Sequence, residues 1–87
     1  MKIKDGFILR EVAGNFIVVA VGSTAKSFNG MINLNETGAF LWKKMQDGSD
    51  AEGLKNALLE EYEIDENTAE KHAKAFIDKL VKAGLVD

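Results

Sequence analysis

The sequence contains no cysteine and no proline, and it has a single histidine. Without cysteine the chain cannot form disulfides, thiolate metal sites, iron–sulfur clusters or a cysteine nucleophile. Without proline, every backbone donor stays available to a helix or a sheet. No apolar run approaches the roughly 20 residues of a membrane-spanning helix. Residues 1–5 are not followed by the apolar stretch and cleavage site of a signal peptide. We therefore expect a cytoplasmic protein.

Clustered positive charge is also missing. The formal net charge is -3 and the isoelectric point is about 5.1. Nucleic-acid binding draws most of its affinity from grouped Lys and Arg side chains, so this balance weakens that hypothesis. The chain has 87 residues, 46% hydrophobic and 29% charged, which is typical of one soluble globular domain spanning residues 1–87.

The first third of the chain predicts strands. Phe7 to Val12 and Phe16 to Val21 are rich in β-branched and aromatic residues, and Ala13-Gly14-Asn15 between them is expected to close a tight hairpin. Since Phe16 to Val21 is apolar on both faces, we expect it to be the central strand. After a loop at residues 22–25, Phe28 to Leu34 alternates and predicts a third, half-buried strand at the edge of the sheet.

From Asn35 the spacing of apolar residues becomes helical. Asn35 is expected to cap a helix over residues 36–46, and Ser49 with Glu52 has the form of a capping box before a second helix that presents Leu54, Leu58 and Tyr62. Asp65 or Asn67 is expected to cap a third helix to about Ala83, ended by Gly84 in the left-handed conformation, with Leu85 and Val86 folding back onto the core. The predicted fold class is α+β: a three-stranded antiparallel sheet followed by three helices, similar to a winged helix-turn-helix.

No set of residues predicts catalysis. The single histidine, His72, has Thr68 and Phe76 at the neighbouring helical positions, and neither is a metal ligand of choice or a titratable partner. The acidic residues between Glu60 and Glu66 lack the ligand pattern and glycine of a calcium loop. The glycines are scattered and form no phosphate-binding motif. We therefore expect no enzyme, no metal and no cofactor, and we assign His72 to the surface and Trp42 to the core.

The third predicted strand is the most suggestive feature. Exposed sheet edges are normally guarded by charge or proline, because their free backbone groups recruit other strands. Phe28 to Leu34 contains neither. The edge could accept an extended peptide as an added strand, or it could be covered by the chain's own termini or by a second copy in a homodimer.

A longer pattern comprises Ile32 to Trp42, Asp47-Gly48, a capped helix ending in Glu61-Tyr62, and the closing Phe76, Leu80 and Gly84 to Val86. This pattern resembles the PqqD-like family. The resemblance implies a winged-helix-like precursor-peptide recognition element. Such a domain binds the leader of a ribosomally made peptide beside its third strand, in a groove closed by its third helix. It then presents the leader to a radical-SAM or other peptide-modifying enzyme.

Carried over by position, the resemblance implies a set of groove residues on the third strand and the third helix. They are Phe28, Asn29, Gly30, Met31, Ile32, Asn33, Lys71, Lys74, Ala75 and Asp78. Lys71 and Lys74 suit an acidic leader. Nothing in the chain points to pyrroloquinoline quinone synthesis in particular.

The leading hypothesis is therefore a non-catalytic, chaperone-like peptide-binding adaptor, with no membrane and no nucleic acid as partner. The alternative is a helix-turn-helix DNA-binding regulator that reads with its third helix. The lysines of this helix alternate with the acidic residues Glu66, Glu70 and Asp78, so the helix presents no continuous basic surface to DNA. This mixed charge argues against that alternative.

Overall fold

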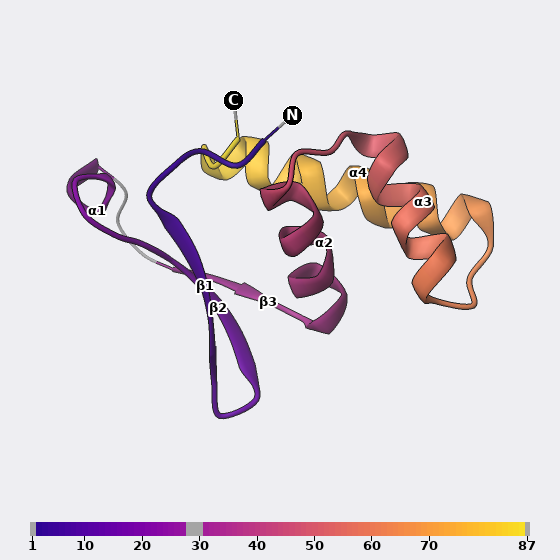
Figure 1. Cartoon of the computed structure of the whole chain (residues 1–87), viewed down its shortest axis with the longest axis horizontal. Coiled ribbons are helices and arrows are strands. Elements are labelled where there is room, and N and C mark those ends of the chain that lie inside the picture. Colours follow the sequence, from indigo (N-terminus) through magenta and orange to yellow (C-terminus); the bar gives the residue numbers. More distant parts are fainter. Residues whose placement is uncertain (1, 28–30, 87) are drawn as a thin grey trace.

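The computed structural model describes residues 2–27 and 31–86. Within them, β1 (Phe7–Val12), β2 (Asn15–Ala20) and β3 (Met31–Leu34) form an antiparallel sheet in the order β1-β2-β3. Three helices follow: α2 (Glu36–Gln46), α3 (Ala51–Glu61) and α4 (Glu66–Ala83). Figure 1 shows the sheet toward one end of the molecule and α2 and α3 toward the other, while the long α4 extends back to the sheet. The predicted α+β fold class, the central position of β2 and the edge position of β3 are confirmed.

The predicted third strand began at Phe28, but residues 28–30 lie outside the described part of the chain, so only Met31–Leu34 can be compared. The expected loop at residues 22–25 is wrong in part. Residues 24 and 25 belong to a one-turn helix, α1 (Thr24–Ser27). Its start is stabilised by hydrogen bonds from Ala25 N to Gly22 O and from Lys26 N to Ser23 O, both 3.2 Å. Such short turns depend on local hydrogen bonds rather than on apolar periodicity, which is why the sequence pattern did not predict this one.

The hairpin between β1 and β2 is tighter than expected. Its turn consists of Ala13 and Gly14, with φ angles of 53° and 81°, and Asn15 already belongs to β2. Two consecutive residues with positive φ are typical of a type I′ turn, which matches the twist of the flanking strands. Glycine adopts this backbone readily, whereas alanine does so at an energetic cost.

Two of the three predicted helix starts are confirmed. Asn35 caps α2 and Asp65 caps α4, each accepting a backbone N–H bond with its side chain. The Ser49–Glu52 capping box is wrong, because α3 is capped by Asp50, whose Oδ1 accepts from Gly53 N at 2.8 Å. A carboxylate is a stronger acceptor than a hydroxyl, which explains why the helix begins one residue later.

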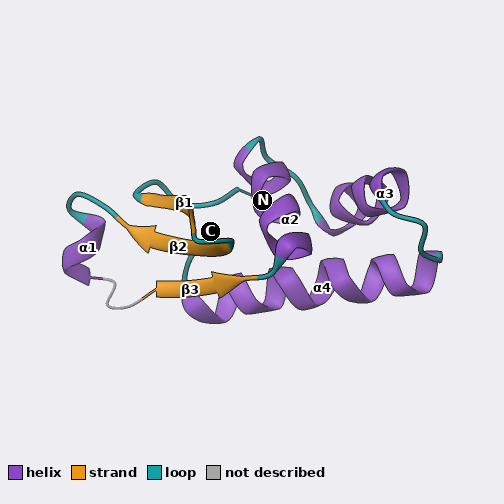
Figure 2. Ribbon diagram, turned by 90° about the horizontal axis from the view of Figure 1, so that it is seen from below, coloured by secondary structure: helices purple, strands orange, loops and turns teal. Residues whose placement is uncertain are grey.

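The end of the chain closes the core as predicted. Gly84 ends α4 with a φ of 81°, and Leu85 and Val86 are buried. Lys4 N donates to Leu85 O at 2.8 Å, and Ile3 forms a β-bridge with Val86. The two ends of the chain therefore meet beside the core, as Figure 2 shows.

One hydrophobic core joins the sheet to the helices. Trp42 lies fully buried in it, as predicted, and its indole Nε1 has no hydrogen-bond partner among the described residues. The other large side chains that are fully buried are Leu41, Met45, Leu54, Leu58, Leu80, Leu85 and Val18. α4 contributes a continuous buried stripe from Ala69 to Leu80. This stripe fixes the rotation of α4 about its axis, and so decides which of its side chains face β3.

Candidate functional site

The direction of the backbone groups in the sheet follows from one hydrogen bond beside β1. The N–H of Val21 donates to the carbonyl oxygen of Gly6 at 2.8 Å. These two residues continue the β1–β2 register as a hydrogen-bonded pair. Because backbone groups alternate in direction along a strand, the odd-numbered residues of β2 face β1 and the even-numbered residues face β3.

The same alternation identifies the free backbone groups of β3. The even-numbered residues of β2 are opposite Ile32 and Leu34, so these two residues face β2. The N–H and C=O groups of Met31 and Asn33 therefore point away from the sheet. β3 is the last strand of the sheet formed by the described residues, so these groups lie on its open edge.

An independent contact agrees with this assignment. The Nζ of Lys79, on α4, donates to the carbonyl oxygen of Asn33 at 3.1 Å. The contact joins residues 46 positions apart in the chain. It therefore places α4 beside the open edge of β3.

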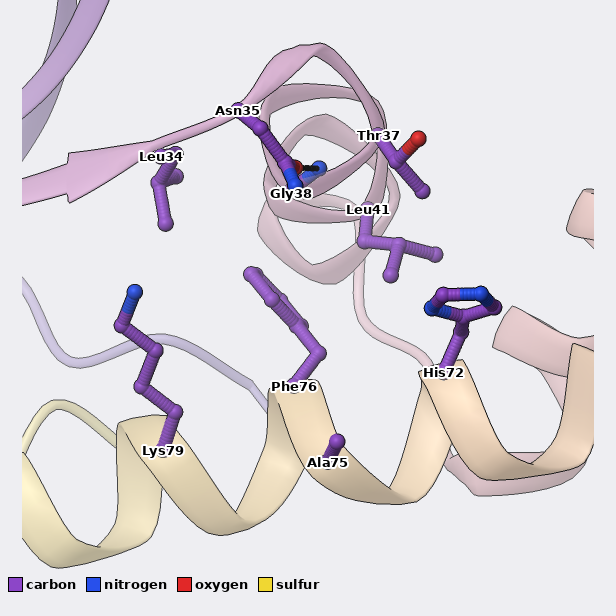
Figure 3. Close-up of a pocket in the computed structure, with 9 residues that line it drawn as sticks. All are labelled: Leu34, Asn35, Thr37, Gly38, Leu41, His72, Ala75, Phe76 and Lys79. Atoms are coloured by element: carbon purple, nitrogen blue, oxygen red, sulfur yellow. Dashed lines mark hydrogen bonds between the residues drawn. The ribbon is translucent and has the colours of Figure 1, made fainter.

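A pocket of about 220 Å³ lies between the end of β3, the start of α2 and α4. Figure 3 shows β3 and the start of α2 on one side of it and α4 on the other, with side chains entering from both. The lining residues are Leu34, Asn35, Thr37, Gly38, Leu41, His72, Ala75, Phe76 and Lys79. We call this surface, together with the open edge of β3, the β3–α4 groove.

The floor of the groove is apolar and its two ends are basic. Leu34, Leu41 and Phe76 form the floor, with exposed fractions of 8%, 2% and 6%. His72 and Lys79 lie two helical turns apart on α4, at opposite ends of the pocket in Figure 3. The arrangement suits an amphipathic ligand that inserts an apolar side chain between two basic ends.

The start of α2 is held rigidly against this floor. Asn35 Oδ1 accepts from Gly38 N at 2.7 Å, the bond drawn in Figure 3. A Cβ at Gly38 would lie 3.3 Å from the Cβ of Leu34 and 3.2 Å from Asn35 Oδ1. The absence of a side chain at Gly38 thus lets the first turn of α2 approach β3 closely.

The structure brings together only part of the site suggested by the family resemblance. Met31, Ile32 and Asn33 lie on β3, and Ala75 lines the pocket. Phe28, Asn29 and Gly30 lie outside the described residues. Asp78 is exposed on α4 and does not line the pocket.

Lys71 and Lys74 line a second depression on α4, together with Asn67 and Glu70. Lys74 Nζ lies 3.1 Å from Glu70 Oε1. The hydrogen bond and charge of Lys74 lower the pKa of Glu70 below its usual value. The charge of Lys74 is therefore already compensated on its own helix.

Eight residues that line the pocket were not in the set predicted from the family resemblance: Leu34, Asn35, Thr37, Gly38, Leu41, His72, Phe76 and Lys79. A signal for three of them was present in the sequence. Positions 72, 76 and 79 follow the i, i+4, i+7 spacing of one helix face. His72 is exposed, as predicted, but it borders the groove.

Two features that can indicate function are absent from the described residues. No three His, Asp or Glu side chains come together there as a metal site would require. No helix in the same residues is both long and apolar enough to cross a bilayer.

Comparison with known proteins gives a family and two similar structures. The family model for coenzyme PQQ synthesis protein D (PqqD) matches residues 9–86. The structure of TbiB1 in complex with the TbiA(beta) leader peptide shares 22% sequence identity and a TM-score of 0.79, over 100% of this chain and 95% of that one. The structure of lasso peptide synthetase B1 complexed with the leader peptide shares 19% identity and a TM-score of 0.74, over 97% of this chain and 93% of that one. No curated protein gives a match. The two structures have the fold described above.

Proposed function

The chain belongs to the PqqD family, and from this premise we propose that it is a non-catalytic adaptor for a precursor peptide. The leader of a ribosomally made peptide adds as a fourth strand along the open edge of β3. The adaptor then presents the peptide to a modifying enzyme, of the radical-SAM or another type. Both similar structures contain a leader peptide, which supports a peptide as the ligand of this fold.

The observation that carries the proposal is the position of the unpaired backbone groups. Met31 and Asn33 each direct an N–H and a C=O toward the open edge, beside the pocket floored by Leu34, Leu41 and Phe76. An added strand alternates its side chains, so every second one points toward α4 and this floor. Main-chain pairing and one apolar pocket are the two components of recognition by strand addition.

The two components contribute differently to binding. Each main-chain hydrogen bond adds on the order of 1 kcal/mol net, whatever the peptide sequence. Burying one leucine-sized side chain adds roughly 1.5–3 kcal/mol. The edge of β3 therefore supplies affinity, while the pocket decides which peptides bind well.

The proposed contact set keeps Met31, Ile32, Asn33 and Ala75 from the sequence prediction. It adds Leu41, His72, Phe76 and Lys79 from the pocket. Lys71, Lys74 and Asp78 are placed at its outer margin, where a longer peptide would reach them. A DNA-binding regulator has less support, because Glu70 and Asp78 interrupt the lysines on the exposed face of α4.

The test is a titration of isotope-labelled protein with a synthetic leader from a short precursor encoded beside its gene. We expect the amide signals of Met31 and Asn33 and those of α4 around Phe76 to shift. The signals of Leu9 and Glu11, on the opposite edge of the sheet, should stay in place. A scrambled leader of the same composition is the matched control. Shifts confined to β1, or none with the authentic leader, would refute strand addition to β3.

A further inference from the structure

The open edge of β3 is partly occupied by the protein itself. Asn33 O is one of the acceptors that an added strand needs, and Lys79 Nζ already donates to it at 3.1 Å. A peptide N–H and the Lys79 ammonium thus compete for the same carbonyl oxygen. A carbonyl oxygen has two lone pairs, but two donors that share it weaken each other's hydrogen bond. Pairing of a peptide with Asn33 is therefore favoured when the Lys79 ammonium finds a better partner.

The charge of Lys79 has no carboxylate partner among the described residues. The ion pairs there join Lys55 to Glu66 and Lys74 to Glu70. No Asp or Glu lines the described part of the groove, whereas His72 does. A cation that leaves Asn33 therefore finds no anion within the groove.

The geometry of an added strand places a ligand side chain close to Lys79. The peptide residue opposite Asn33 donates its N–H to Asn33 O and points its side chain away from α4. Its two neighbours point their side chains to the face shared by Ile32 and Leu34, which is the core side of the sheet. Since α4 approaches β3 from this side, these neighbours are the residues that can reach Lys79.

The groove is long enough for two such side chains. Residues two apart on a strand are about 6.7 Å apart, while His72 and Lys79 are separated by about 10 Å along α4. One same-face side chain can therefore meet Lys79 while the next fills the pocket over Leu41 and Phe76.

We propose that Lys79 is a specificity-determining residue: it closes the edge at Asn33 and is drawn away by an acidic side chain of the peptide, two residues from the apolar side chain that fills the pocket. This inference rests on the proposed function and names the class of peptide. An acidic residue gives the displaced ammonium a charge-assisted hydrogen bond. A neutral residue leaves the ammonium without an anionic partner, and a basic residue repels it.

The experiment is selection from a library of random nine-residue peptides displayed on phage, carried out in parallel on the full chain and three variants. With the unmodified chain we expect Asp or Glu to be enriched about tenfold over Lys and Arg at the position two residues from a conserved apolar one. Lys79→Glu should invert this preference. Lys79→Met, which keeps the aliphatic stem, should remove it while apolar selection persists. Lys82→Met is the matched control, an exposed lysine of α4 outside the pocket and outside the proposed contact set, and it should keep the acidic preference.

The outcomes separate this inference from the proposed function. Apolar enrichment with no preference for acid, or an acidic preference that survives Lys79→Glu, overturns the role of Lys79 and leaves strand addition standing. Loss of the acidic preference in Lys82→Met alone assigns the role to Lys82 and likewise overturns the proposal. A failure to enrich any peptide on any form of the chain overturns both.

Discussion

The two edges of the sheet are protected in different ways. On β1, backbone groups of Leu9 and Glu11 face away from β2, and the strand itself carries two exposed charges, Arg10 and Glu11. On β3, Met31–Leu34 contains no charge, and the cation at its edge comes from Lys79 on α4. Charged side chains at an edge prevent unwanted pairing with other strands.

The two edges differ in whether the charged group that protects them can move away from the strand. A charge on the strand itself stays at the edge whatever approaches it. A charge at the end of a flexible side chain from another element can move to a new partner while the strand stays in place. The charges of β1 therefore protect its edge permanently, whereas a suitable ligand can draw Lys79 away from β3 and pair with that edge.

Proline substitution on the two edges tests this comparison with the largest expected effect. Asn33→Pro removes an N–H that points to the open edge and places a ring where the added strand would lie. It leaves the β2 ladder intact, because proline is tolerated where the N–H faces solvent. We expect affinity for a selected peptide, measured by fluorescence anisotropy, to fall by at least about tenfold, or about 1.4 kcal/mol.

The matched variant on the other edge is Glu11→Pro, whose lost N–H also faces away from β2. The affinity of this variant for the same peptide should stay within about twofold of the affinity of the unmodified chain. Thermal unfolding followed by circular dichroism verifies that both variants fold. Equal losses in the two variants would show that the edges do not differ in function.

Much of the fold was predictable because its signals are local. The β-branched and aromatic residues of Phe7 to Val12 and the apolar spacing of Ala69 to Leu80 are signals that each lie within one element. Asn35 and Asp65 were predictable as helix starts because their side chains accept hydrogen bonds from the backbone N–H groups of the first turn. Gly84 was predictable as a helix end because glycine adopts the left-handed conformation readily. The missed features were α1, the two-residue turn and the Asp50 cap, and each depends on a choice between neighbouring residues.

The helix side of the groove was harder to predict, because it depends on how α4 is rotated against β3. Successive helical residues differ in direction by about 100°. Lys71 and Lys74 were carried over by position from the family resemblance, and they lie outside the pocket that His72, Phe76 and Lys79 line. The packing of the whole buried stripe from Ala69 to Leu80 into the core fixes that rotation. The strand side needed no such information, since Met31, Ile32 and Asn33 follow from period and edge position alone.

A second prediction concerns the turn that joins β1 to β2, away from the edge of β3. Ala13 has a φ of 53°, a conformation that costs a residue with a Cβ on the order of 1 kcal/mol and that asparagine tolerates. Ala13→Asn should raise the free energy of unfolding by about 1 kcal/mol, measured by urea denaturation with an unchanged slope. Peptide affinity should not change. Ala13→Val should lower stability, because a β-branched residue adopts positive φ poorly. Equal stability of Ala13→Asn and Ala13→Val would contradict the positive φ at this position.

The smallest expected effect lies at the opposite end of α4 from Lys79, where Asp65 caps the helix. Hydrogen bonding from Thr68, through its side chain and its backbone N–H, lowers the pKa of Asp65 below the ordinary value of 3.8. Because the folded-state pKa is the lower one, the stabilisation is present above the ordinary value and is lost as pH falls through the folded-state value. Asp65→Asn keeps a capping acceptor but cannot titrate. In urea denaturation at about pH 6 and about pH 3, the unmodified chain should therefore lose slightly more stability than this variant. Equal losses would mean that Asp65 does not contribute to the pH dependence, so that other carboxylates account for the whole of it.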